Sequence, residues 1–246
     1  MHTSKTFIYE RNSSTLNHYH PIQFNLIHTI AINNIMSKSS PAPPSPPPPS
    51  ATAIINPQYC VPHEIDLIIT KPVTFGGENN FTVTDINKNV VFTVIGPIAA
   101  MLMPKERFLR DARGNTVLRL RKAIGDDIWK AYRGESTEQR DLIFTRWLPP
   151  PFQLQATMAV FLANKNTTQV CDFKLRKQNS FGQSWLVCVG ESDTVIAEIK
   201  HEVFTWFSRK KFMVKVYPNV DYAFIVALTV TLEYHLSHSD LAKFSG

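Results

Sequence analysis

The sequence predicts one antiparallel, mainly β domain that packs around a buried apolar segment near the C-terminus. From about residue 57 onward, short runs rich in Val, Ile, Phe and Thr are separated by Gly, Asn, Asp and Pro. The intervals are roughly eight to twelve residues, the spacing typical of β-sandwiches and barrels. Within several runs apolar and polar residues alternate, as expected when one face of a strand is buried. Residues 222–232 form an apolar run. Because spanning a bilayer takes about 20 apolar residues, we expect this run to be buried in protein.

Twelve runs between turn residues are candidate strands. They cover residues 64–70, 80–84, 90–95, 107–110, 116–121, 128–132, 142–147, 158–163, 170–176, 184–189, 194–200 and 211–217. Alternation assigns the faces in some of them. Phe173 and Leu175 point to one side of their strand, whereas Lys174 and Arg176 point to the other. One face of the sheet is therefore expected to be core, and the other carries the charges.

Two parts of the chain, residues 83–94 and 109–120, align with each other without gaps. Each predicts a strand, a turn that begins with Asp, and a second strand. An Asp side chain bonds the turn backbone, and Gly or Asn tolerates a positive φ. The turn at Asp85 also begins like a calcium-binding loop, but Val90 and Gly96 stand where such a loop requires Gly and Glu. Two similar hairpins are therefore expected, and no calcium site.

The apolar run near the C-terminus is compatible with either a helix or a strand. Its last residues alternate, because Thr or Glu follows each of Leu228, Val230 and Leu232, and this pattern favours a strand. Its length favours a helix, with Asn219 as the N-cap and Asp221 in the first turn, where an acid complements the helix dipole. The pattern alone leaves both alternatives open. A helix this apolar must be enclosed, and a sheet closed around it would also remove exposed strand edges.

Composition indicates a globular chain with a mild bias toward anionic partners. Hydrophobic residues make up 43% and charged residues 19% of the 246 residues, which are ordinary globular values. The net charge of +6 favours lipid headgroups, nucleic acid or acidic proteins over cationic partners. A slightly basic soluble surface is the alternative explanation. The three cysteines lack C-x-x-C spacing, so neither a disulfide framework nor a zinc site is predicted, and a reducing compartment fits better.

The two ends of the chain are predicted to lie outside the folded domain. Residues 41–50 hold seven of the seventeen prolines, a composition that forms an extended polyproline tract and cannot pack a core. We therefore expect a disordered extension over residues 1–55, a folded domain over 56–236 and a flexible tail over 237–246.

The first 35 residues form neither a convincing secretory signal nor a strong transit peptide. Our hypothesis is that they precede a natural start at Met36. The predicted location is cytoplasmic, with peripheral contact at the plasma membrane as a further expectation and the nucleus left open. No transmembrane span is predicted.

Four stretches form a specific combination: Asn56–Cys60, Gly134–Thr145, Gly190–Asp193 and Val216–Phe224. Together they resemble the LURP-one-related family of plant proteins, over roughly residues 56–236. The resemblance implies a tubby C-terminal-like fold, as in tubby domains and phospholipid scramblases. This fold is a closed antiparallel β-barrel of about twelve strands around a central hydrophobic C-terminal α-helix. The resemblance also implies an association with plant defence, and it favours the helix for the apolar run.

The resemblance transfers few functional residues. Tubby domains bind phosphoinositide headgroups through basic side chains, yet no tubby lipid-binding motif can be matched here residue by residue. The cysteine-rich palmitoylation cluster of scramblases is also missing from the sequence. Membrane contact is therefore implied at the level of the fold alone.

Basic side chains gather at the ends of three predicted strands. As charge-assisted donors they could hold phosphate groups of an anionic headgroup. The candidate ligands are Arg119, Arg121, Lys122, Lys174, Arg176, Lys177, Arg209, Lys210 and Lys211. Trp206 and Phe207 precede the third group, and an aromatic pair beside cations suits a membrane interface. The alternative is that these cations only form the solvated outer face of the strands.

The sequence predicts a binding or adaptor module and no enzyme. It contains no G-x-S-x-G, P-loop, G-x-G-x-x-G or H-E-x-x-H motif. His235 and His238 lack a recognisable third metal ligand, and His201 beside Glu202 lacks a nucleophile partner. No cofactor or metal is predicted. The expected partners are anionic membrane lipids or a protein. A nucleic-acid-associated regulator and a scramblase-like lipid-handling protein are the alternatives, and nucleic acid is disfavoured because no recognition helix or stacking motif supports it.

Overall fold

The structure is a computed structural model. It describes residues 53–71, 80–96, 105–125, 127–148, 157–163, 170–178, 183–190, 192, 194–202 and 210–243. The expected N-terminal extension lies outside the described residues, apart from residues 53–55. Arg209, Trp206 and Phe207 also lie outside them.

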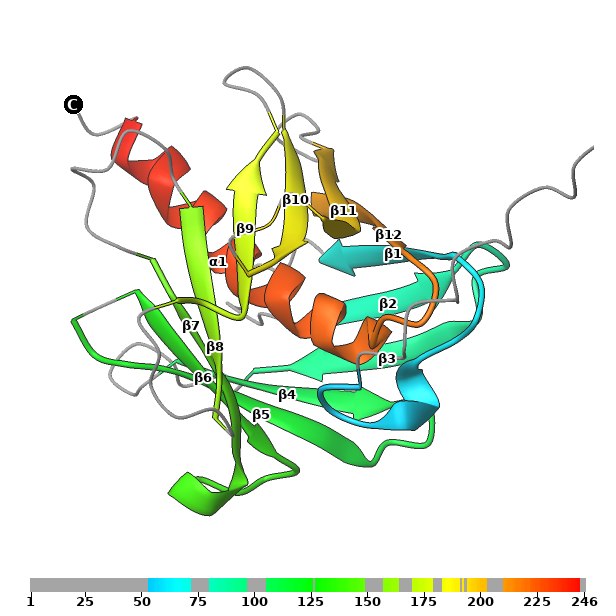
Figure 1. Ribbon diagram of the computed structural model, residues 1–246, viewed down its shortest axis with the longest axis horizontal. Helices are drawn as coiled ribbons and strands as arrows, with labels where there is room; N and C mark the ends of the chain where they lie inside the picture. The colour runs from blue at the N-terminus through cyan, green and yellow to red at the C-terminus, as the bar shows by residue number, and fades with distance from the viewer. Residues whose placement is uncertain are drawn as a thin grey trace, which may run out of the picture. The chain divides into compact units, whose positions relative to one another are not determined.

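Twelve antiparallel strands of the described chain close into one barrel (Figure 1). Each predicted strand is present, with its ends shifted by at most three residues. The strands are β1 (Ile65–Lys71), β2 (Phe81–Asp85), β3 (Val90–Ile95), β4 (Glu106–Asp111), β5 (Thr116–Lys122), β6 (Ile128–Arg133), β7 (Leu142–Trp147), β8 (Thr157–Leu162), β9 (Phe173–Lys177), β10 (Ser184–Val189), β11 (Val195–Glu202) and β12 (Lys210–Val216). Short 3-10 turns, Pro57–Tyr59 and Gln139–Asp141, precede β1 and β7.

Each strand is paired on both sides. Neighbours in sequence are neighbours in the barrel, and β1 closes the sheet by pairing with β12, where Leu67 lies opposite Val214. The faces alternate as predicted in β9, where Phe173 and Leu175 are buried and Lys174 is partly exposed. Closure therefore leaves none of these twelve strands with an open edge.

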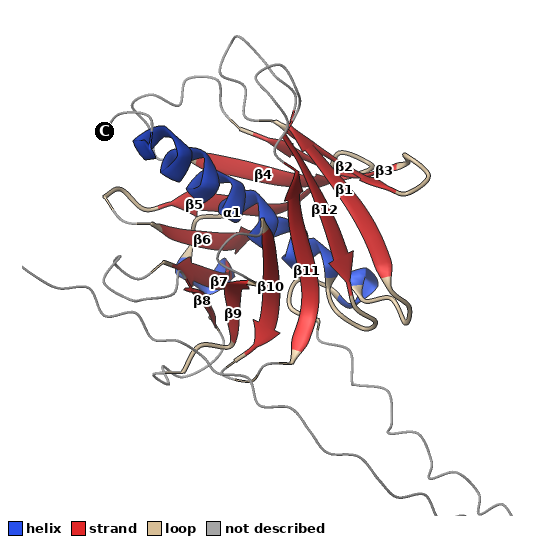
Figure 2. Ribbon diagram, turned by 90° about the horizontal axis from the view of Figure 1, so that it is seen from above, coloured by secondary structure: helices blue, strands red, loops and turns tan. Residues whose placement is uncertain are grey.

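Within the described residues, one long helix, α1 (Tyr222–Lys243), lies inside the barrel and leaves it at one end (Figures 1 and 2). Its first three turns are almost completely buried, and Phe224 packs edge-on against Phe144 with ring centroids 5.2 Å apart. The helix that the resemblance favoured is thus confirmed. It continues through much of the segment 237–246, for which a flexible tail was expected, and ends at Lys243.

Two threonines explain why the end of the apolar run looked like a strand. Thr229 and Thr231 are fully buried, and each hydroxyl donates a hydrogen bond within the helix. Thr229 Oγ1 bonds the Ile225 carbonyl at 2.9 Å, and Thr231 Oγ1 bonds the Leu228 carbonyl at 2.8 Å. Because the helix itself satisfies these hydroxyls, the alternation of Leu or Val with Thr says nothing about two faces of a strand.

The start of α1 differs from the expectation. Asn219, the predicted N-cap, has a φ of +63° and donates its backbone N–H to the Val61 carbonyl at 2.7 Å. The capping side chain is Asp221, whose Oδ1 accepts the Phe224 N–H at 3.1 Å. Asp221 and not Asn219 caps the helix because a capping side chain bonds the N–H two or three residues after it. Asp221 directly precedes the helix, which starts at Tyr222.

The other carboxylate oxygen of Asp221 fixes the segment before β1. Its Oδ2 accepts the backbone N–H groups of Ile54, Ile55 and Asn56 at 3.2, 2.7 and 3.1 Å. Asp221 is completely buried, and this burial raises the pKa of its carboxyl above the ordinary value, although the N–H donors oppose the rise. One side chain therefore joins the start of the domain to the start of its central helix.

The two predicted hairpins are present as β2–β3 and β4–β5 and agree in detail. Asp85 accepts the backbone N–H of Asn89 at 2.8 Å, and Asp111 accepts that of Asn115 at 2.8 Å. Hydrogen bonds from the side chains of these two asparagines, assisted by the backbone bonds, lower the pKa of both carboxyls. Each hairpin also has a register shift in its first strand, and the second sequence repeat therefore reproduces the turn of the first.

Candidate functional site

One end of the barrel collects charged side chains around the outgoing helix. Because neighbouring strands are antiparallel, the odd-numbered strands end here and the even-numbered strands begin here. Three contacts place the C-terminal half of α1 at this end. Glu233 contacts Lys71, Tyr234 contacts Lys122, and His235 contacts Asp127. We call it the exit end, and we call the end that carries the Asp85 and Asp111 turns the opposite end.

A buried ion pair anchors the helix at the exit end. Arg146 is completely buried, and its guanidinium donates to both oxygens of Asp127 at 3.0 Å and to the Thr231 carbonyl at 3.3 Å. His235 Nδ1 lies 3.5 Å from Asp127 Oδ2. Burial alone would raise the pKa of Asp127. The hydrogen bond from His235 and the charge of Arg146 outweigh burial and hold the pKa well below its ordinary range.

A second buried acid faces further cations. Glu233, only 3% exposed, accepts hydrogen bonds from Lys71 Nζ at 2.9 Å and from the Ser237 hydroxyl at 2.6 Å. Burial lowers the pKa of Arg107, and the charge of Glu233 opposes that shift. These groups hold the helix in place, so part of the positive charge at the exit end is structural.

The predicted ligand Lys122 belongs with this structural set. Its Nζ lies 5.4 Å from the ring centroid of Tyr234, and Lys105 Nζ lies 4.4 Å from the same ring. The alternation within β5 predicts this structural role, because it places Lys122 on the inner face. Leu118 and Leu120 are buried on the inner face of β5, and Lys122 falls on the same side two residues later.

Arg119 and Arg121 point outward from β5 and share one carboxylate. Arg119 donates to both oxygens of Glu106 at 2.8 and 2.9 Å and to the Glu135 carbonyl at 3.0 Å. Arg121 Nε lies 3.5 Å from the nearer Glu106 oxygen. Directly opposite Arg121 on β6 is another cation, Lys130, which was not among the candidates chosen from sequence. It becomes recognisable only once the register of β5 and β6 is known.

A hollow of about 270 Å³ lies over this pair of strands. Its lining residues are Arg121, Lys122, Ala123, Ile124, Lys130 and Tyr132. Ile124, in the loop between β5 and β6, is 84% exposed, and Trp147, the last residue of β7, is 39% exposed. An apolar tip beside cations and, separately, an indole ring therefore lie at the exit end. Neither residue was among the candidates chosen from sequence, although an isoleucine directly before a glycine in a short turn is a usable signal.

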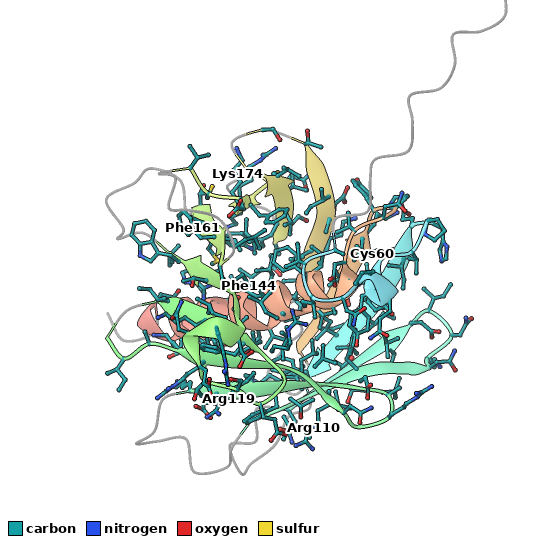
Figure 3. The ribbon with its side chains drawn as sticks, turned by 60° about the horizontal axis from the view of Figure 1, so that its bottom comes forward. Cys60, Arg110, Arg119, Phe144, Phe161 and Lys174 are labelled. Atoms are coloured by element: carbon teal, nitrogen blue, oxygen red, sulfur yellow. The ribbon has the colours of Figure 1, made fainter. Side chains whose placement is uncertain are left out.

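The remaining predicted ligands lie in other sectors of the barrel. In β9, Lys174 and Arg176 are partly exposed and Lys177 is exposed at the strand end. Lys210 begins β12 opposite Lys71, and Lys211 pairs with Glu202 at 3.3 Å. Three strands separate β5 from β9, and two separate β9 from β12. Figure 3 shows Arg119 and Lys174 far apart on the barrel. The structure thus brings the three strand ends to the same end of the barrel but does not unite them in one pocket.

Within the described residues there is no cluster of three or more His, Cys, Asp or Glu side chains that could hold a metal ion. In the same part of the chain, no helix has the length and apolar character needed to cross a bilayer.

Twelve antiparallel strands closed around a C-terminal helix define a tubby C-terminal-like domain. A sequence model described as LURP-one-related matches residues 65–233, which is more than half of the chain, and the protein therefore belongs to the LURP-one-related family.

Individual relatives agree with this assignment. The chain is 38% identical to LURP-one-related 15 of Arabidopsis thaliana over 185 residues, covering 73% of this chain and 84% of that protein. It is 37% identical to LURP-one-related 10 of the same plant over 187 residues, covering 74% and 95%. Among solved structures, the X-ray structure of a protein from Arabidopsis thaliana matches with a TM-score of 0.57 and 36% identity, covering 74% of this chain and 96% of that one.

Proposed function

We propose that this LURP-one-related protein is a non-enzymatic binding module whose exit end attaches peripherally to an anionic membrane surface. The observation that carries the proposal is the exposed Ile124 beside Arg121 and Lys130. An apolar side chain can enter the boundary between headgroups and acyl chains. Each nearby cation adds about 1 kcal/mol of attraction to an anionic leaflet. Trp147 supplies the kind of ring that favours the membrane interface.

The cations on β9 and β12 extend this surface in the proposal. Lys177 and Lys210 lie at strand ends at the same end of the barrel as Ile124, in other sectors. A broad, shallow set of charges suits a surface better than a small molecule, because no single pocket gathers them. The corresponding location is the cytoplasmic face of the plasma membrane.

A substitution at the apolar tip tests the proposal. Ile124→Asp should weaken cosedimentation with phosphatidylserine vesicles about tenfold or more, because it removes an inserting side chain and adds like charge. The matched control is Ile86→Asp, since Ile86 is also exposed (69%) but lies in the turn at the opposite end. Equal loss of binding in both variants, or wild-type binding that does not weaken with salt, would contradict the proposal.

The other candidate functions require α1 to be accessible. A helix that reads a nucleic-acid groove and a segment that enters a bilayer must both present their side chains to the outside. The apolar half of α1, from Ala223 to Leu232, is instead enclosed by the strands. We therefore place binding on the outer surface of the exit end.

A further inference from the structure

Arg121 and Lys130 form a like-charge pair in the register of the barrel. They lie directly opposite each other on β5 and β6. Like charges at such positions destabilise a sheet, whereas a cation opposite an anion stabilises it. The neighbours of the pair in the same row are Glu106 on β4 and Thr145 on β7. Only one of the two flanking residues is an acid.

That acid does not neutralise the pair. Both oxygens of Glu106 are engaged by Arg119 at 2.8 and 2.9 Å, and Arg121 is 3.5 Å away. Among the described residues, Lys130 has neither an ion pair nor a side-chain hydrogen bond. Glu106 therefore pairs with the two arginines and not with Lys130, and the surplus positive charge faces the hollow.

The hollow is large enough for one chemical group of a ligand but smaller than the pockets that enclose whole drug-sized ligands. At about 270 Å³ it lies below the roughly 300 Å³ at which pockets for drug-sized ligands begin. Tyr132 lines it beside the two cations, and the exposed Ile124 also belongs to its lining. A ligand held here would thus sit next to the proposed membrane-inserting tip.

We propose that this hollow binds a phosphomonoester, with Arg121 and Lys130 on either side of the phosphate. A phosphomonoester carries about −1.5 to −2 charges at neutral pH and has three acceptor oxygens, so one group can satisfy both cations. The guanidinium fork binds two oxygens, and the lysine supplies a point charge. A phosphodiester or a carboxylate offers less charge, so the site distinguishes a phosphorylated headgroup from phosphatidylserine. That the phosphate belongs to a lipid headgroup rests on the proposed function. A soluble phosphomonoester would present the same chemistry to the two cations.

The substitution Lys130→Glu separates binding from stability. It replaces the like-charge pair with a cross-strand ion pair to Arg121, so the melting temperature should rise by about 1–4 °C. The same change should abolish selective binding of the phosphate. Lys200→Glu is the charge-matched control, because Lys200 is an exposed residue of β11 that lies opposite Ser184 and Met213, away from the hollow.

The test compares binding to two kinds of vesicle that are matched in surface charge. One kind carries a phosphatidylinositol monophosphate, and the other carries phosphatidylserine. The wild-type chain should prefer the first about tenfold, Lys200→Glu should keep that preference, and Lys130→Glu should lose it. If the wild type binds both vesicles equally well, the phosphate site is overturned and the proposed function stays intact. A melting temperature lowered by Lys130→Glu also overturns it, because the unfavourable pair would not exist.

A soluble probe distinguishes the two sources. Glycerol phosphate should raise the melting temperature of the wild type and of Lys200→Glu but not that of Lys130→Glu. If neither vesicle binds, the proposed membrane function fails, and this shift alone supports a site for soluble phosphomonoesters. If neither vesicles nor glycerol phosphate act through Lys130, the inference is wrong.

Discussion

Asp221 holds together two segments that are 165 to 167 residues apart in the chain. Removing the carboxylate takes the acceptor away from four backbone N–H groups, and two of these bonds are fully buried. A buried donor without an acceptor is expensive, and the lost helix cap adds to the cost.

We therefore expect Asp221→Ala to lower the free energy of unfolding by about 2–4 kcal/mol, as measured by urea denaturation. Asp66→Ala is the control, because Asp66 is exposed on β1, and there the loss should stay below about 1 kcal/mol. Similar losses in the two variants would show that the four hydrogen bonds contribute little.

At the scale of elements, the two Asp-started hairpins carry different residues at the turn position that takes a positive φ. Lys88 has a φ of +68° in the first turn, and Gly114 has a φ of +87° in the second. A side chain at such a φ costs about 1–2 kcal/mol, although glycine loses more entropy on folding.

Replacing Lys88 by Gly should therefore stabilise the domain by about 0.5–1 kcal/mol in thermal or urea unfolding. The reciprocal change Gly114→Lys should destabilise it, although a Cβ atom added at Gly114 would meet nothing within 4 Å beyond its chain neighbours. The cost there must then come from the backbone alone. A neutral result for both variants would contradict this account.

Element boundaries were predictable from sequence because turn residues separate the runs, and several strands, such as β5 and β9, alternate in burial. The conformation of α1 was harder to predict. Its amphipathic signal is absent since the barrel encloses it on all sides, and Thr229 and Thr231 mimic the alternation of a strand while bonding their own helix. The resemblance to a family, not the local pattern, decided its conformation.

At the scale of the whole molecule, Asp127 connects three distant parts of the chain. It lies before β6, binds Arg146 on β7 and contacts His235 on α1. Its pKa is held below the ordinary value, so the ionised carboxylate stabilises the folded state at any pH above the unfolded-state pKa. This contribution is lost as the pH falls below about 4 toward the folded-state pKa.

The wild-type free energy of unfolding should therefore fall with acidification below about pH 4, and Asp127→Asn should make that fall shallower. At neutral pH the variant should already be less stable by about 3–5 kcal/mol, because Arg146 is left buried without its partner. Urea unfolding across this pH range measures both effects. Parallel curves for the two proteins would contradict them.

The candidate site was only partly predictable because it depends on which strand ends meet. Sequence identified Arg119 and Arg121 as outward cations, but it could not show that β5, β9 and β12 present their basic ends at the same end of the barrel. That follows from the antiparallel closure. Lys130 illustrates the limit, because a lysine in an alternating strand gains its meaning from the residue on the adjacent strand.

The central position of α1 also has a consequence for how the protein is made. The helix is the last part of the domain to leave the ribosome, and β12, the partner that closes the sheet against β1, is made just before it. Until then no helix covers the inward apolar faces of the earlier strands. The growing chain must carry these apolar faces through synthesis, a period in which chaperones protect such surfaces from aggregation. Folding of this domain can be completed only after α1, which fills the barrel, has been synthesised.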